Sequence, residues 1–202
     1  PSQVLEWWRK ARSSMLGAFE GMDQGERVPW YGPPMSPASF VTARLMETWA
    51  HGQDIVDALG LGRLPTVRLR HVAYIGVRAR RNSYAARGRE MPEGEVRVEL
   101  DGPGGARWTW NEDGTDSISG DAVDFCLVVT QRRHLADTDL VIEGSLATGW
   151  MQIAQAFAGP PGGHRGLARQ PRPDDRGRLD RDRQAPRPVE QPVAAGGDLG
   201  PL

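Results

Sequence analysis

The sequence contains a single cysteine, Cys126, among its 202 residues. One cysteine excludes an internal disulfide framework and a cysteine-rich zinc module. Long apolar runs are also missing, because no stretch approaches the about 18 consecutive apolar residues of a membrane-spanning helix. The start of the chain lacks the basic segment and apolar segment that are typical of a secretory signal. These absences predict a soluble, cytoplasmic protein without a membrane partner.

An excess of either charge is missing too. The chain has 25 basic and 26 acidic residues, and its formal net charge is −1. A protein that binds nucleic acid without sequence preference needs an excess of positive charge to offset the phosphates. The charge balance therefore argues against a nucleic-acid partner.

Aromatic residues are absent after Phe157. The C-terminal stretch, residues 160–202, consists mainly of Gly, Pro, Arg and Asp, without apolar periodicity. Such a segment buries too little apolar surface to offset the entropy of ordering it. We predict a disordered tail over residues 160–202.

Helical patterns fill the first part of the chain. Apolar residues recur at helical spacing over residues 2–22. Ser36 is typical of an N-cap and Pro37 of a first helical residue, which predicts a second helix ending near Leu59. A third helix is expected over residues 65–86. Together these elements predict a helical N-terminal domain over residues 1–88.

The pattern changes to a period of two after Pro92. Alternating residues predict a strand over 96–100, a glycine-rich turn over 101–105 and a partner strand over 108–110. We further expect a helix over 122–133, a short strand over 140–142 and a last helix over 145–157. The sequence thus predicts an α+β protein, in which residues 89–159 form a small α+β domain.

Glu47 and His51 are the most suggestive pair for chemistry. Residues four apart on a helix lie on the same face, so both side chains can bind one divalent cation. A helical projection predicts which face of this helix points into the protein, and its residues are Val41, Leu45, Thr48, Gly52, Ile55 and Leu59. Glu47 and His51, together with Asp54, lie at the edge of this face. The expected outer face carries Met46, Ala50, Gln53 and Asp57. The alternative is an ordinary surface pair that contributes a few tenths of a kcal/mol.

The remaining reactive residues have simpler interpretations. We expect Cys126 to be a buried, inert thiol because its neighbours are apolar. His71 is expected to bond a neighbouring carbonyl, His134 to complement a helix C-terminus, and His164 to be solvated. Trp7, Trp8, Trp30 and Tyr31 are interpreted as packing and loop-anchoring residues rather than a ligand pocket. The Arg132-Arg133 doublet could bind a carboxylate bidentately, against the alternative of a solvated helix end.

The run Ala43-Arg-Leu-Met-Glu-Thr-Trp-Ala-His-Gly-Gln-Asp-Ile55 resembles the metal-binding helix of the DinB-like superfamily. More closely, it is similar to the actinobacterial mycothiol-dependent maleylpyruvate isomerase family. The segments Trp30–Ser36 and Asp124–Arg133 resemble an uncharacterised subgroup of that family. The resemblance covers residues 1–162.

The resemblance implies an N-terminal four-helix bundle followed by a small domain like the sterol carrier proteins. It also implies a divalent metal, usually zinc, held by a histidine of the first bundle helix and by Glu47 and His51. The first-helix histidine has no counterpart here, so the bundle is expected to be incomplete. In the family, the metal holds a low-molecular-weight thiol, mycothiol, as the thiolate that adds to an electrophilic small molecule.

Two alternatives stay open at this point. The chain could be a non-catalytic remnant, an interaction module whose metal site is incomplete and which forms a homodimer through the open bundle face. A related C-terminal segment is sometimes labelled a wyosine-type tRNA-modification domain, but no basic stripe supports that label here. Whether the protein is an isomerase or thiol transferase therefore depends on the metal site.

Overall fold

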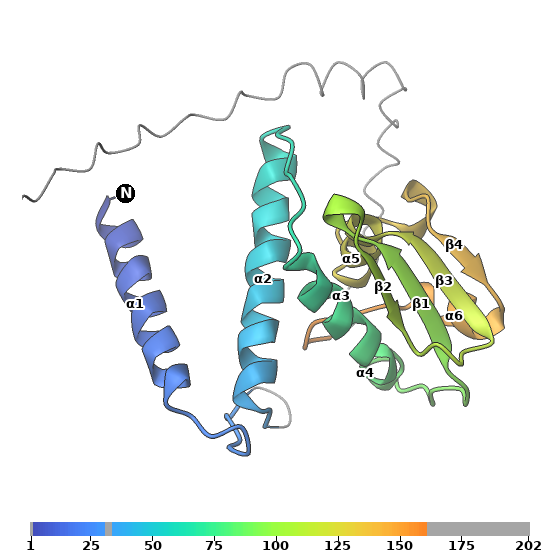
Figure 1. Ribbon diagram of the computed structural model, residues 1–202, viewed down its shortest axis with the longest axis horizontal. Helices are drawn as coiled ribbons and strands as arrows, with labels where there is room; N and C mark the ends of the chain where they lie inside the picture. The colour runs from blue at the N-terminus through green and yellow to red at the C-terminus, as the bar shows by residue number, and fades with distance from the viewer. Residues whose placement is uncertain (1, 31–33, 161–202) are drawn as a thin grey trace, which may run out of the picture. The chain divides into compact units, whose positions relative to one another are not determined.

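The computed structural model describes residues 2–30 and 34–160, all within one compact unit. It has the predicted α+β architecture, with helices first and a four-stranded sheet after them (Figure 1). The predicted tail lies outside the described residues, apart from Pro160. None of the described helices is long and apolar enough to cross a bilayer. The α-helices and strands are α1 (Ser2–Glu20), α2 (Pro37–Ala58), α3 (Leu69–Arg78), α4 (Arg80–Ala85), β1 (Val96–Asp101), β2 (Arg107–Trp110), β3 (Asp116–Asp121), α5 (Ala122–Val129), β4 (Val141–Glu143) and α6 (Ser145–Met151).

Helix α2 begins and ends where the sequence predicts. The Ser36 hydroxyl accepts a hydrogen bond from the backbone N–H of Ser39 at 3.3 Å, and Pro37 is the first helical residue. Leu59 is the C-cap. This agreement arises because capping depends on residues next to each other in the chain.

The predicted inner face of α2 is wrong. Met46 and Ala50, expected on the outer face, are 3% and 1% exposed, and α2 packs against α3. Ile55 and Leu59, expected inside, are 62% and 64% exposed. Apolar residues occur on both sides of α2, so periodicity alone could not decide which side α3 covers.

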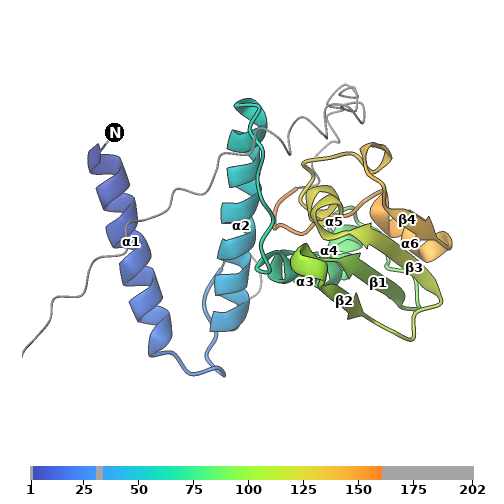
Figure 2. The same cartoon turned by 45° about the horizontal axis from the view of Figure 1, so that its top comes forward.

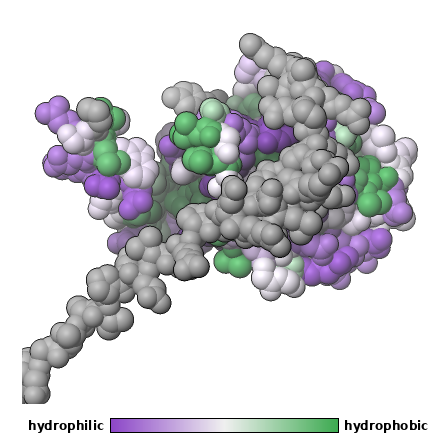
Figure 3. Space-filling model, turned by 90° about the horizontal axis from the view of Figure 1, so that it is seen from above, coloured by the Kyte–Doolittle hydropathy of each residue, from purple (hydrophilic) through white to green (hydrophobic). Residues whose placement is uncertain are grey.

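Helix α1 contributes nothing to the buried core. None of its described residues is buried, and its contact with α2 includes Phe19 stacked on Phe40 with the ring centroids 5.2 Å apart. Trp7 and Trp8 are 69% and 46% exposed, so the prediction that they pack in the core is wrong. Figure 3 shows apolar side chains of this region exposed among charged ones.

The sheet has the strand order β2-β1-β3-β4. β1 pairs antiparallel with β2 across the predicted turn, and parallel with β3. β3 also pairs antiparallel with β4. The sequence pattern does not predict β3, because Ile118 is its only large apolar residue; pairing on both sides buries this polar strand instead.

The two last helices are shorter than predicted. α5 ends at Val129 because Gln131 adopts a left-handed φ of 61°, and the N–H of Arg132 turns back to the carbonyl of Leu127 at 2.7 Å. α6 ends at Met151. Beyond it, the N–H of Ala156 donates to the carbonyl of Val129 at 2.8 Å, so this segment bonds the C-terminal end of α5 instead of continuing as a helix.

The core lies between one face of the sheet and the helices. α5 and α6 pack on the sheet, α3 packs on α5, and α2 packs on α3 (Figures 1 and 2). Phe125 of α5 meets Trp150 of α6 edge to face, with their centroids 6.1 Å apart. Helix α2 is therefore connected to the sheet through α3 and α5, which belong to the same core. The domain boundary expected near residue 88 stays a prediction.

Candidate functional site

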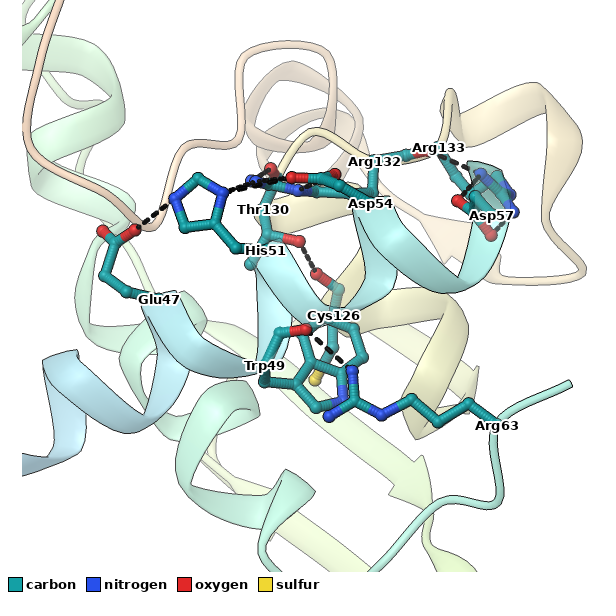
Figure 4. Close-up of polar contacts among 10 residues, drawn as sticks. All are labelled: Glu47, Trp49, His51, Asp54, Asp57, Arg63, Cys126, Thr130, Arg132 and Arg133. Atoms are coloured by element: carbon teal, nitrogen blue, oxygen red, sulfur yellow. Dashed lines mark hydrogen bonds and ion pairs between the residues drawn. The ribbon is translucent and has the colours of Figure 1, made fainter. Parts of the chain in front are cut away.

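Glu47 and His51 of α2 face each other. Oε2 of Glu47 lies 3.4 Å from Nε2 of His51, one helical turn away (Figure 4). The Glu47 side chain is 29% exposed and that of His51 is 69% exposed. The two side chains therefore converge as predicted, but at the surface of the protein rather than within it.

The second ring nitrogen of His51 is also engaged. Nδ1 lies 3.2 Å from Oδ2 of Asp54, on the next turn of α2. A carboxylate can only accept, so this contact is a hydrogen bond when Nδ1 carries the proton. Nη2 of Arg132 lies farther from the same nitrogen, at 3.5 Å, and donates to it only in the other tautomer. When Nδ1 carries the proton, Nε2 of the neutral ring carries a lone pair on the side where Glu47 lies.

Asp54 is itself held by an arginine from a distant part of the chain. Arg132 donates from Nε to Oδ1 at 3.0 Å and from Nη2 to Oδ2 at 2.9 Å (Figure 4). The hydrogen bond with Arg132 is the main reason that the pKa of Asp54 lies below its ordinary value, although partial burial acts in the opposite direction. Asp54 is thus ionised and fixed beside the imidazole at neutral pH.

A second, parallel pair lies one turn further along α2. Arg133 donates from Nη1 and Nη2 to the two carboxylate oxygens of Asp57, at 2.9 and 3.0 Å. The arginine doublet therefore binds carboxylates bidentately, which was one of its two predicted interpretations. Its partners lie 78 and 76 residues away in the chain, so spacing could not identify them. The doublet joins α2 to the segment after α5.

The distance between Glu47 and His51 fits a shared cation. Zinc ligands lie about 2.0–2.2 Å from the ion in a tetrahedral arrangement, which places two neighbouring donors about 3.3–3.6 Å apart. The observed distance of 3.4 Å between Oε2 of Glu47 and Nε2 of His51 lies within this range. Over residues 2–30 and 34–160, however, no group of three or more His, Cys, Asp or Glu side chains could hold a metal ion. The described chain thus supplies two neighbouring ligands.

The other histidines are separate from this pair. His71 is exposed on α3. His134 was expected to complement a helix C-terminus as a cation, but its Nδ1 instead accepts a hydrogen bond from the N–H of Ala136 at 3.2 Å. His164 lies outside the described residues. The structure brings a carboxylate to each side of the His51 imidazole.

Cys126 is fully buried, as predicted, with its thiol 3.8 Å from the carbonyl of Leu69. Burial raises the pKa of the Cys126 thiol well above its ordinary value, and the charge of Asp121 raises it further. We therefore expect a thiol-reactive disulfide reagent to leave Cys126 unmodified in the folded protein and to react with it fully in denaturant. The absorbance of the thiolate that the reagent releases measures the reaction. A rapid reaction of the folded protein would contradict the conclusion that Cys126 is buried and unreactive.

Comparison with known proteins supports the resemblance for the N-terminal part. The family model of the mycothiol maleylpyruvate isomerase N-terminal domain matches residues 1–56, the part that contains Glu47 and His51. The match confirms the resemblance over these residues.

Two uncharacterized proteins from strains of Mycobacterium tuberculosis, MT0041 and Rv0036c, are each 46% identical to this chain over 163 residues. The aligned region covers 80% of this chain and 63% of each relative, so the chain spans less than two thirds of their length. No solved structure matches the chain.

Proposed function

Starting from the family match over residues 1–56, we propose that this protein binds a divalent metal, zinc above all, through Glu47 and His51. The metal would serve thiol-dependent chemistry of the mycothiol-dependent isomerase or thiol-transferase type. The observation that carries the proposal is the 3.4 Å approach of Oε2 to Nε2.

Residues of this chain prepare both ligands. Asp54 accepts the Nδ1 proton of His51 and so leaves the Nε2 lone pair available to a cation. Glu47 supplies a negative charge beside it. A bound divalent cation would keep a coordinated thiol deprotonated at neutral pH, in the form that adds to an electrophilic carbon. The exposure of His51 leaves room for a thiol and a small-molecule electrophile to approach.

A titration with Co²⁺, a coloured substitute for Zn²⁺, tests the proposal. We expect a visible absorption band that saturates at one Co²⁺ per chain, disappears when Zn²⁺ is added, and shifts when mycothiol is added. The His51→Ala and Glu47→Ala variants should each lose the band, because either change leaves a single ligand. The His71→Ala variant is the matched control, since His71 is also an exposed helical histidine. Equal binding by the His51→Ala variant would refute the proposal.

One observation favours a second candidate, a non-catalytic module with an incomplete site. The described residues supply two ligands, and a protonated His51 could bridge Glu47 and Asp54 as a surface ion-pair network without any metal. This candidate predicts weak Co²⁺ binding that is equal in the His51→Ala variant and the parent, and no response to mycothiol.

A further inference from the structure

A cavity of about 730 Å³ lies between α2, the α3–α4 helices and residues 156–159. Its volume is within the range of small-molecule sites, about 300–1,000 Å³. Its wall is largely apolar and aromatic, with Trp30, Met46, Tyr74 and Phe157 among the lining residues. Such walls favour a flat, apolar ligand body.

Two charged side chains line the same cavity, Arg78 and Glu47. Arg78 lies in the last turn of α3 and is exposed. Several other arginines donate hydrogen bonds to carbonyl or carboxylate oxygens of the protein, namely Arg80, Arg87, Arg132 and Arg133. In the part of the chain that the structure describes, Arg78 makes neither a hydrogen bond nor an ion pair. Its guanidinium is therefore available to a ligand.

The charge balance of the cavity limits that ligand to a single negative charge. Among the described residues that line the cavity, Arg78 is the one cationic side chain, and Glu47 opposes an anion. The first turn of α2 also lines the cavity through Ala38 and Ser39, but the N–H of Ser39 already donates to the Ser36 hydroxyl, and Arg78 lies at the C-terminal end of α3, which carries partial negative charge. A phosphate, with nearly two charges, requires several N–H donors beside the guanidinium. A carboxylate matches one guanidinium, with two parallel hydrogen bonds.

We infer that this cavity binds an aromatic monocarboxylate, with Arg78 as the anchor of its carboxylate. The inference rests on the proposed function in one respect. Glu47 both lines the cavity and is a proposed metal ligand, so the carboxylate ligand would lie next to the proposed metal site. The cavity itself is independent of any metal. The test is therefore made on metal-free protein, where its failure leaves the Co²⁺ titration unaffected.

The test compares two probes of nearly equal shape, 2-naphthoate and its neutral amide, 2-naphthamide. Their dissociation constants are measured by ligand-observed NMR on the full chain in the presence of EDTA. We expect 2-naphthoate to bind more tightly than the amide and, in a spectrum of the protein itself, to shift the indole N–H resonance of Trp30. The Arg78→Gln variant should raise the Kd of 2-naphthoate about tenfold, as expected for the loss of a charged hydrogen bond, and leave the Kd of the amide within about twofold.

The Arg81→Gln variant is the matched control. Arg81 is an exposed arginine, the second residue of α4, and is not among the residues that line the cavity. Both variants remove one surface charge, so circular dichroism should show each of them folded. Equal binding of acid and amide, an unchanged Kd in the Arg78→Gln variant, an equal loss in the Arg81→Gln variant, or no binding of either probe would each overturn the inference.

Discussion

Replacing Asp54 with alanine is expected to weaken the proposed binding of a divalent metal about 10- to 100-fold, the range typical for the loss of a hydrogen-bond partner of a ligating histidine. The carboxylate of Asp54 lies 3.2 Å from Nδ1 of His51 and is itself held by Arg132. Without it, the ring loses the group that favours a proton on Nδ1, so the tautomer with the lone pair on Nε2 is no longer preferred. Competition of Zn²⁺ with a coloured chelator measures the change in affinity.

The Asp57→Ala variant is the matched control for this prediction. Each substitution removes the bidentate partner of one arginine of the doublet, but only Asp54 touches His51. Nitrogen NMR of the metal-free protein, at a pH where His51 is neutral, separates the two parts of the argument. Asp54→Ala should shift the tautomer population away from Nδ1–H, whereas Asp57→Ala should not. Equal metal affinities in the two variants would show that Asp54 merely fastens α2.

The largest expected loss of stability comes from Phe125. This side chain is fully buried in α5, packs edge to face on Trp150, and fills the space left by Gly76, where an added Cβ would lie 3.1 Å from its ring. Truncation of a buried phenylalanine to alanine costs about 3–5 kcal/mol, because a cavity remains where the ring packed. We expect the Phe125→Ala variant to lose that much unfolding free energy in a urea titration.

Trp7→Ala is the control for this prediction, because Trp7 is 69% exposed on α1. Its expected effect lies within about 0.5 kcal/mol, the usual range for a surface substitution away from special features. A loss in Phe125→Ala of less than about 1.5 kcal/mol would indicate that α3 and α5 close over the space. A large loss in Trp7→Ala would indicate that α1 is packed against something in solution.

The features that the sequence predicts correctly depend on residues close together in the chain. Ser36 and Pro37 start α2 because a cap is a local hydrogen bond. The alternation in β1 and the glycine turn before β2 predict the hairpin for the same reason. Convergence of Glu47 and His51 also follows from helical spacing alone.

The features that the sequence does not predict depend on the tertiary structure. The buried side of α2 is decided by α3, which covers Met46 and Ala50. The polar strand β3 is buried because β1 and β4 pair with it. The role of Asp54 requires Arg132, which the fold brings to it from 78 residues away. A signal was nonetheless present, since Asp54 and Asp57 lie one turn apart and the two arginines are adjacent.

Because Arg132 holds Asp54 beside His51, the orientation of the imidazole depends on the folded protein and not on α2 alone. A peptide with the α2 sequence would carry both ligands, but its imidazole would rotate freely and lose entropy on every binding event. In the folded chain that entropy is lost during folding, when the contact between segments 78 residues apart closes. Metal binding and unfolding would therefore be thermodynamically linked, and a saturating metal ion would stabilise the contact between α2 and the segment that follows α5.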